Sequence, residues 1–361
     1  MRLPVIRKKG RSVPVLLVGL ALLFCFLTGC GNRKIVLTTG FSEDEVFRID
    51  DCVCTRAEVL VYLANLHNQY SKAYGDAIWD TRIGDGTLEE SVKQTVLARL
   101  AKIKMMNLMA ESYRITLEES EQEAVREAAR DYYGRLTSAE ISAMGGVDES
   151  TVERMYREYA IAEKVYLYLT RDVNTEVSDD EARTITVQQI SLHDYIIDED
   201  GNPRKYTAAE REQLRELAET LMERLADGED FEDLSLSYND EDEMTIGVSR
   251  GKSDETILEA CAMLGEGEIS PVVETEDGFH IYRCVSAYDR DQTEQRKEEI
   301  LRERAKQAFA SAYEAFAGQH ESYLNEELWG ELKYQGDTDD NNVDFFDIYS
   351  RYVTIRNGEA H

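Results

Sequence analysis

The sequence predicts an α+β protein in which a mainly helical lobe carries an inserted β/α domain. The pattern Ser/Thr-x-x-Glu, a reciprocal helix N-cap, recurs between residues 55 and 210. After residue 30 the only prolines are Pro203 and Pro271, so long helices can run uninterrupted. From Thr184 the sequence changes to short β-rich and helical segments, and a long charged helical stretch follows them.

The first thirty residues have the pattern of a lipoprotein signal. Residues 1–29 combine a basic start, an apolar run over residues 13–27 and small residues before a cleavage point, which is typical of an exported chain. The run is short for a membrane-spanning helix, which needs about 20 apolar residues. Leu27-Thr28-Gly29-Cys30 resembles a lipobox, in which Cys30 takes a diacylglyceryl group. The alternative is an uncleaved anchor helix with an incidental cysteine.

We therefore expect a mature protein on the extracytoplasmic face of the cell membrane, held by the Cys30 lipid through a polar tether, residues 30–45. Two acyl chains suffice for stable anchoring. The chain has 72 acidic and 41 basic residues and a formal charge of −31. This charge repels nucleic acid and anionic membrane surfaces, which excludes both as direct partners of the polypeptide.

The cysteines and histidines predict neither a metal site nor a cofactor. Cys52 and Cys54 are two residues apart, which is poor disulfide geometry, and Cys261 and Cys284 lie far along the chain. No Cys/His spacing matches a zinc site. We interpret the four as buried free thiols. Sequence motifs of hydrolases, such as Gly-x-Ser-x-Gly, are missing from suitable contexts.

Residues 46–180 are predicted to form the N-terminal helical lobe. Residues 46–54 have the pattern of a strand, a tight turn and a second strand, and residues 55–172 are mainly helical. Two apolar stripes at helical spacing run along residues 88–106 and 152–166. The helix starts are predicted at the N-caps Thr55, Thr87, Thr116, Thr137, Ser150, Ser178 and Thr207.

Residues 181–288 are predicted to form a separate domain. A strand at 184–192 is followed by helices at 208–225, 231–238 and 254–264, with an irregular acidic loop before the last helix, and a strand closes the domain at 279–285. Residues 289–335 contain a long charged helix, expected from about Gln292 to Glu327, that completes the lobe. Residues 336–361 form an acidic and aromatic tail, which is either loose or a docked strand.

The domain at 181–288 resembles a parvulin-type peptidyl-prolyl isomerase. The most specific stretch is Gly267-Glu268-Ile269-Ser270-Pro271-Val272, followed by His280 ten residues after Ser270, and the segments 228–240 and 258–264 also match. The plan of residues 46–334 resembles the extracytoplasmic foldases of the PrsA/SurA type. This resemblance implies a lobe that binds unfolded exported proteins and a domain that isomerises their X–Pro bonds.

When the parvulin pattern is carried over position by position, the resemblance implies which residues are catalytic. His280 matches the second of two facing histidines, whereas the first falls on Gln189, a substitution. A Cys or Asp position falls on Glu241, with Asp240 adjacent. Gln189 can form hydrogen bonds but cannot reproduce the tautomers of a histidine pair. We expect the acidic groups Asp240, Glu241 and Asp277 to favour the charged form of His280.

The substrate pocket is carried over in the same way. The pocket Phe falls on Ile257 and the pocket Met on Ser253, while a Thr and a Ser before the second histidine fall on Thr275 and Asp277. The resulting hypothesis is a membrane-anchored foldase that isomerises X–Pro bonds, and we expect its isomerase activity to be weak or absent because of these substitutions. The alternative is a catalytically inactive holdase that keeps the parvulin fold as a scaffold. Tyrosines on the predicted helices belong either to a client-binding cradle or to the core (Tyr132, Tyr133, Tyr156, Tyr159, Tyr166 and Tyr168).

Overall fold

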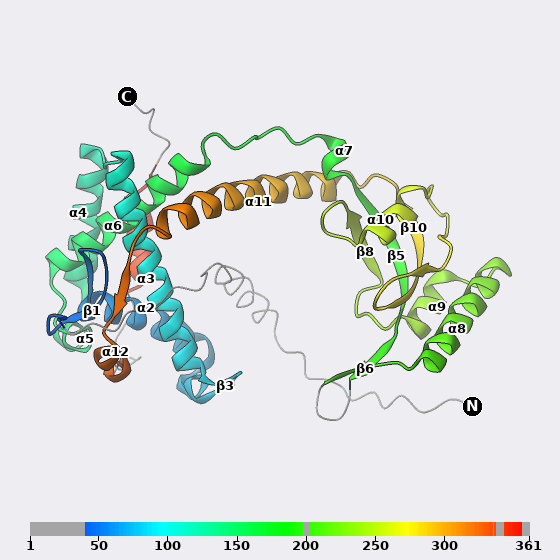
Figure 1. Ribbon diagram of the computed structural model, residues 1–361, viewed down its shortest axis with the longest axis horizontal. Helices are drawn as coiled ribbons and strands as arrows, with labels where there is room; N and C mark the ends of the chain where they lie inside the picture. The colour runs from blue at the N-terminus through cyan, green and yellow to red at the C-terminus, as the bar shows by residue number, and fades with distance from the viewer. Residues whose placement is uncertain (1–39, 85, 198–201, 335, 337–342, 356–361) are drawn as a thin grey trace. The chain divides into compact units, whose positions relative to one another are not determined.

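The computed structural model describes residues 40–84, 86–197, 202–334, 336 and 343–355. The predicted signal, residues 1–29, and Cys30 lie outside them. The chain divides into two compact units (Figure 1). Unit 1 contains the described residues up to Asp172 and those from Gln307 onward, and unit 2 is the continuous segment Val173–Lys306. The mainly helical first unit and the mixed second unit confirm the predicted α+β class.

Unit 1 has a small antiparallel sheet with the order β11-β1-β2. Strands β1 (Glu45–Ile49) and β2 (Cys52–Thr55) form the predicted strand-turn-strand. The third strand, β11 (Ser322–Leu324), pairs with β1 and places Leu324 opposite Phe47. The prediction of one helix as far as Glu327 is therefore wrong. Helix α11 (Arg290–Ala317) ends before Gly318, a poor helix former. The chain then forms β11, which pairs with the otherwise unpaired edge of β1.

Long helices make up most of unit 1, as predicted for residues 55–172. Three predicted N-caps, Thr55, Thr87 and Thr137, are confirmed. Two others are wrong by two residues, because Glu118 caps the helix expected after Thr116 and Asp148 caps the helix expected after Ser150. The described elements are α2 (Arg56–Tyr74), η1 (Asp76–Asp80), β3 (Arg82–Ile83), β4 (Gly86–Thr87), α3 (Leu88–Tyr113), α4 (Glu119–Arg135), α5 (Ser138–Ala143), α6 (Glu149–Thr170), α12 (Glu326–Glu331) and α13 (Phe345–Tyr352).

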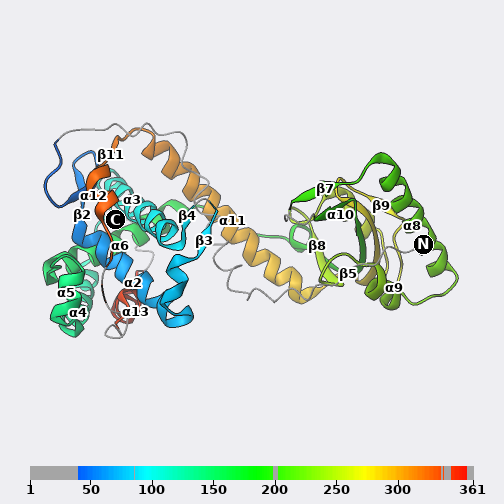
Figure 2. The same cartoon turned by 90° about the horizontal axis from the view of Figure 1, so that it is seen from below.

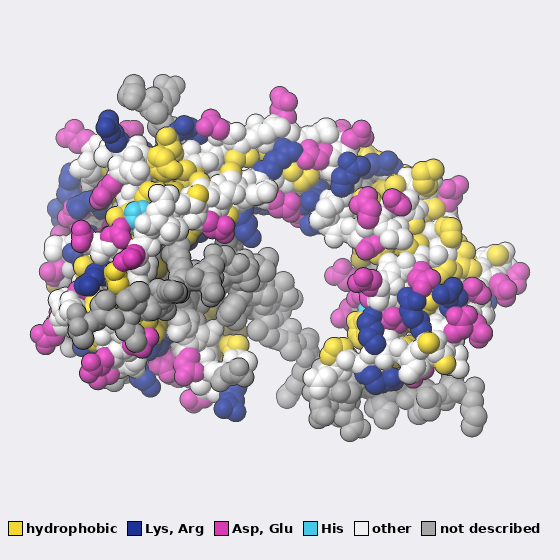
Figure 3. All heavy atoms as spheres, in the orientation of Figure 1, with side chains coloured by type: hydrophobic (Ala, Val, Ile, Leu, Met, Phe, Trp, Pro, Cys, Tyr) yellow, Lys and Arg dark blue, Asp and Glu magenta, His cyan; other side chains and the backbone are white. Residues whose placement is uncertain are grey.

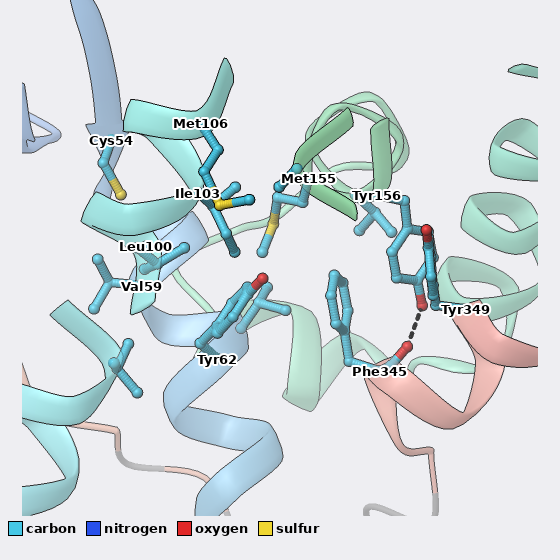
Figure 4. Close-up of a cluster of buried hydrophobic side chains, with 14 of the residues drawn as sticks. Cys54, Val59, Tyr62, Leu100, Ile103, Met106, Met155, Tyr156, Phe345 and Tyr349 are labelled. Atoms are coloured by element: carbon cyan, nitrogen blue, oxygen red, sulfur yellow. Dashed lines mark hydrogen bonds between the residues drawn. The ribbon is translucent and has the colours of Figure 1, made fainter. Parts of the chain in front are cut away.

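Helix α13 shows that both alternatives for the tail, a loose segment or a docked strand, are wrong. It is a docked helix that contacts α4 and α2 (Figure 2). Phe345 is fully buried and lies between the rings of Tyr62 and Tyr156 (Figure 4). The Tyr132 ring also packs edge-on against it, with centroids 5.2 Å apart. The Tyr156 hydroxyl donates to the Phe345 carbonyl over 2.7 Å. The mixture of acidic and aromatic residues in this segment forms a short amphipathic helix, and its apolar side completes the core.

Unit 2 is built on an antiparallel sheet with the order β8-β5-β10-β9. Strand β8 was predicted as part of an irregular loop, because an edge strand of five residues with Gly247 at its centre has a weak pattern. The described elements are α7 (Asp179–Ala182), β5 (Thr184–His193), β6 (Tyr195–Ile197), β7 (Pro203–Lys205), α8 (Ala208–Ala226), α9 (Phe231–Tyr238), β8 (Thr245–Ser249), α10 (Glu255–Ala262), β9 (Val273–Glu274) and β10 (Gly278–Ser286).

The sheet of unit 2 has two different faces. Alternate residues such as Ile190 and Ile281 form one core with side chains from α8 and α9. On the opposite face, Val187 and Tyr282 form a second core with Cys261 of α10. The candidate site lies on this second face, because its residues alternate in step with Val187 and Tyr282.

Several observations concern the described residues as a group. Cys54, Cys261 and Cys284 are buried free thiols as expected, whereas Cys52 is a free thiol that is only partly buried. Burial raises the pKa of Cys261 to about 12. Across the described part of the chain, no helix has the length and apolar character required to cross a bilayer. The same residues contain no cluster of three or more His, Cys, Asp or Glu suited to a metal ion. Acidic and basic side chains are interspersed on the face of each unit seen in Figure 3.

Candidate active site

The pairing of β5 with β10 determines which side chains meet at the candidate site. Ser191 lies opposite His280, and Gln189 lies opposite Tyr282. The expectation that Gln189 faces His280 directly is therefore wrong by two residues, although the two strands are neighbours as predicted. Since alternate residues share a face, Gln189, Ser191 and His193 lie on the same side of the sheet as His280.

One nitrogen of His280 belongs to a chain of hydrogen bonds that ends at the backbone. The side chain is only 4% exposed, and its Nδ1 lies 3.0 Å from Ser191 Oγ. Ser191 Oγ donates to Gln189 Oε1 over 3.2 Å. Gln189 Nε2 in turn donates to the Glu243 carbonyl over 2.8 Å, which fixes the orientation of the amide. Gln189 thus acts on His280 through Ser191.

The other nitrogen of His280 faces Thr275 and Asp277. Its Nε2 lies 2.8 Å from Thr275 Oγ1 and 3.3 Å from Asp277 Oδ1. Thr275 also donates to Asp277, so its single proton serves either the carboxylate or the imidazole. The structure therefore places both residues carried over from the resemblance at the histidine, and they hold its ring in one orientation.

Burial determines the charge of His280. Desolvation lowers the pKa of His280 from its usual value, and the nearby Asp277 carboxylate acts in the opposite direction without overcoming this effect. The expectation that acidic neighbours favour the charged form is thus confirmed for Asp277 and Glu241, but burial outweighs them and the net shift of the His280 pKa is downward. Burial also opposes the ionisation of Asp277, but its hydrogen bond from Thr275 and the adjacent His280 outweigh burial and lower the pKa of Asp277.

Glu241 and Asp240 contact His193, a residue that the sequence analysis missed. Glu241 Oε1 lies 3.1 Å from His193 Nε2, and Asp240 Oδ2 accepts from the His193 backbone N–H over 2.8 Å. The His193 ring stacks on Tyr195, with centroids 4.9 Å apart. Period-two spacing from Gln189 through Ser191 would have indicated His193, because it places the ring on the face of the site.

The two predicted pocket residues have different surroundings. Ile257 of α10 packs against the core that contains Tyr282, and the Tyr282 ring lies parallel to that of His280 with centroids 6.1 Å apart. Ser253 Oγ accepts from the Ser249 backbone N–H over 3.2 Å and so closes the turn after β8. Ile257 therefore belongs to the apolar core on the face of the site, whereas the observed contact of Ser253 is structural.

Comparison with protein families identifies the class of this domain. Residues 200–286 match the family described as Rotamase, the PPIC-type PPIASE domain. The match includes His280 and the segment with Asp240 and Glu241, and it begins after Gln189. Unit 2 therefore contains a domain of the parvulin type, the class of peptidyl-prolyl isomerases predicted from the sequence.

Relatives extend the similarity beyond this domain. The chain is 25% identical over 285 residues to Foldase protein PrsA from Caldanaerobacter subterraneus subsp. tengcongensis, covering 77% of this chain and 82% of that protein. It is 36% identical over 93 residues to Chaperone SurA from Thiobacillus denitrificans, covering 24% and 21%. The chain is thus a PrsA/SurA-like protein with a parvulin domain, and a chaperone or isomerase role follows from this class.

Two further comparisons are more limited. Foldase protein PrsA from Bacillus subtilis is 31% identical over 99 residues, which cover 25% of this chain and 34% of that protein. The crystal structure of a peptidylprolyl isomerase (PrsA) from Bacillus anthracis is 15% identical, covers 67% of this chain and 99% of that chain, and has a TM-score of 0.35. This score is too low to establish a common arrangement of the whole chain.

Proposed function

We propose that the chain is a membrane-anchored extracytoplasmic foldase. It binds unfolded or partly folded exported proteins and catalyses cis-trans isomerisation of their X–Pro bonds by a non-covalent mechanism. One observation carries the proposal: His280 is held between Ser191 and Thr275 on the sheet of a parvulin-type domain. A buried histidine with a partner at each nitrogen has one defined ring orientation, and it holds the polar side chains around it in place.

The chemistry requires only that the site favour a twisted amide. Rotation about an X–Pro bond has a barrier of about 20 kcal/mol and takes tens of seconds or longer without a catalyst. A twisted amide loses resonance, and an environment that withdraws water from its carbonyl lowers the barrier. Ser191, Gln189 and Thr275 fix the imidazole, and the buried Tyr282 ring packs against it from the core of the sheet.

The test combines two assays on the same preparation. A protease-free assay follows isomerisation of a fluorogenic prolyl peptide, and light scattering follows aggregation of an unfolded client. We expect activity in both, and His280→Ala should lower the isomerase rate about tenfold or more without loss of aggregation suppression. Activity in neither assay would refute the foldase proposal.

A second candidate is a holdase without catalysis, and Gln189 at the position of the first histidine favours it. Here the relay through Ser191 would serve only to stabilise the sheet. Suppression of aggregation with no isomerase rate, unchanged in His280→Ala, would select this alternative. Gln189→His serves as the matched gain-of-function variant, since the holdase should remain inactive unless the histidine pair is restored.

The anchor belongs to the same proposal, and it depends on the sequence at Cys30. A diacylglyceryl group there would hold the protein at the outer face of the membrane. Growth with labelled palmitate should label the wild-type chain, and Cys30→Ala should remove the label and release the protein from the membrane fraction. Cys25→Ala, within the apolar run, is the control. Label retained in Cys30→Ala would contradict lipidation at this residue.

A further inference from the structure

Unit 1 contains a cavity of about 580 Å³ that neither the isomerase site nor the predicted tether explains. Helices α3 and α6, Phe309 of α11 and residues 353–355 after α13 line it. This volume falls within the range of ordinary ligand pockets, about 300–1,000 Å³. All of its lining residues belong to unit 1, so the cavity is a feature of the helical lobe itself.

Arg99 is the unusual group in this cavity. It is half-buried, and its Cζ lies 4.0 Å from the Phe346 ring centroid and 5.5 and 5.8 Å from those of Tyr62 and Tyr159. Within the described part of the chain, no carboxylate forms an ion pair with it. Aromatic faces attract a guanidinium but do not neutralise it, and arginine stays protonated. Its donors therefore suit a carboxylate from outside the chain.

The other charged residues of the lining support this reading. Lys102 follows Arg99 by one turn of α3, and its Nζ lies 4.5 Å from the centroid of Phe309. Glu163, the acidic residue of the lining, already accepts a hydrogen bond from the Tyr349 hydroxyl over 2.6 Å. The lining thus contains Arg99 and Lys102 and a single carboxylate, in a chain whose formal charge is −31. At physiological salt, screening weakens the repulsion between a bound carboxylate and acidic residues more than about 8 Å away.

The rest of the lining is apolar and aromatic. Ile103, Met106 and Leu167 supply aliphatic surface, and Tyr166, which is 38% exposed, lies tilted against Phe309 with ring centroids 5.3 Å apart. Of the tyrosines considered as a client cradle, Tyr159 and Tyr166 line this cavity, whereas Tyr132 and Tyr156 are buried in the core under α13. The cavity thus combines a surface for a large apolar side chain with Arg99, which has no ion pair among the residues that the structure describes.

We infer that this cavity recognises segments of unfolded client proteins in which an acidic side chain adjoins a large apolar or aromatic one. The inference rests on the proposed foldase function and adds a selectivity to it. The apolar side chain would occupy the surface between α3 and α6. The carboxylate would form charge-assisted hydrogen bonds with Arg99, with Lys102 nearby as a second cation.

Two fluorescein-labelled ten-residue peptides without proline test the inference, since a proline-free peptide offers no bond for the parvulin domain to isomerise. They differ only in Phe-Asp against Phe-Asn at the centre. Fluorescence anisotropy with the purified chain should show about tenfold tighter binding of the Asp peptide. Arg99→Gln should reduce this ratio to about one, and Arg99→Lys should retain part of it because the charge remains but the planar fork is lost.

Control variants separate this site from general effects. Arg130→Gln removes an exposed cation of α4 outside the cavity and should leave the ratio unchanged, as should His280→Ala. Circular dichroism melting verifies that Arg99→Gln is folded, and Arg99→Lys provides a milder variant if it is not. Equal binding of the two peptides, or a preference that persists in both Arg99 variants, overturns the inference but leaves the foldase proposal intact. Failure of both peptides to bind, together with failure to suppress aggregation, overturns both.

Discussion

The imidazole of His280 has a partner at each nitrogen but only one proton to share when it is neutral. With a proton on Nδ1 it donates to Ser191, and with a proton on Nε2 it donates toward Thr275 and Asp277. Gln189 favours the first arrangement, because its Oε1 accepts the Ser191 proton and leaves Ser191 Oγ as an acceptor. The residue at the first histidine position thus influences the tautomer of the second.

This arrangement predicts a dependence of stability on pH. Burial lowers the pKa of His280 in the folded protein, so between its usual value near 6.5 and the lowered value the unfolded chain binds more protons. Stability should therefore fall as the pH falls below about 6.5. Urea unfolding at pH 7.5 and 5.5 should show a larger loss in the wild type than in His280→Asn. Equal losses would show that His280 is not held neutral.

Lys104 differs from His280 because it is a buried charged side chain with two acidic partners. It is 1% exposed, and its Nζ lies 2.7 Å from Glu58 Oε1 and 2.7 Å from Glu158 Oε2. Lys104→Met should destabilise unit 1 by about 3–5 kcal/mol, because both carboxylates lose their counter-charge. Adding Glu158→Gln should recover part of this loss in urea unfolding. Lys333→Met, at an exposed position, should change little, and a similar small change in Lys104→Met would contradict the argument.

The site residues differ in how far the sequence could predict them. Thr275, Asp277 and His280 lie within six residues, so one local pattern sufficed and the structure brings them together. Ser191 and His193 were missed because they reach the site through the register of β5 against β10, which the sequence does not display. The direction of the pKa shift was missed for a related reason, since burial is a tertiary property.

At the level of elements, local signals predicted helices and strands well where each element is long. The stripes at residues 88–106 and 152–166 became α3 and α6. The errors, β8, β11 and α13, are all short elements of eight residues or fewer whose conformation depends on a distant partner. β11 pairs with β1 at the other end of the sequence, and no local periodicity can reveal such a pairing.

The contribution of α13 to unit 1 can be measured with two variants of one helix. Phe345→Ala removes a fully buried ring and should lower the free energy of unfolding of unit 1 by about 3–5 kcal/mol. Tyr352→Ala, in the last turn and 39% exposed, should cost much less. Differential scanning calorimetry should assign the loss to unit 1 alone. An equal effect of both variants would mean that α13 does not depend on the packing of Phe345.

At the level of the whole molecule, the two units differ in continuity. Unit 2 is one segment, Val173–Lys306, with two hydrophobic cores of its own. A fragment of these residues should therefore fold alone, give a cooperative thermal transition and keep whatever isomerase rate the full chain has, within about twofold. A fragment of residues 40–172 should not, because it lacks β11 and α13. Cooperative unfolding of the latter would contradict the assignment of both elements to its core.

The pairing of β1 with β11 has a consequence for biogenesis. A polypeptide that emerges from a membrane pore N-terminus first presents β1 long before Ser322–Leu324 and Phe345 arrive. Unit 2, which contains the parvulin domain, includes no residue after Lys306. It can therefore fold before the last strand and helix of the helical lobe have been translocated. If the chain is exported as proposed, it would itself be incompletely folded until translocation nears completion, with Tyr62 and Tyr156 accessible to other chaperones.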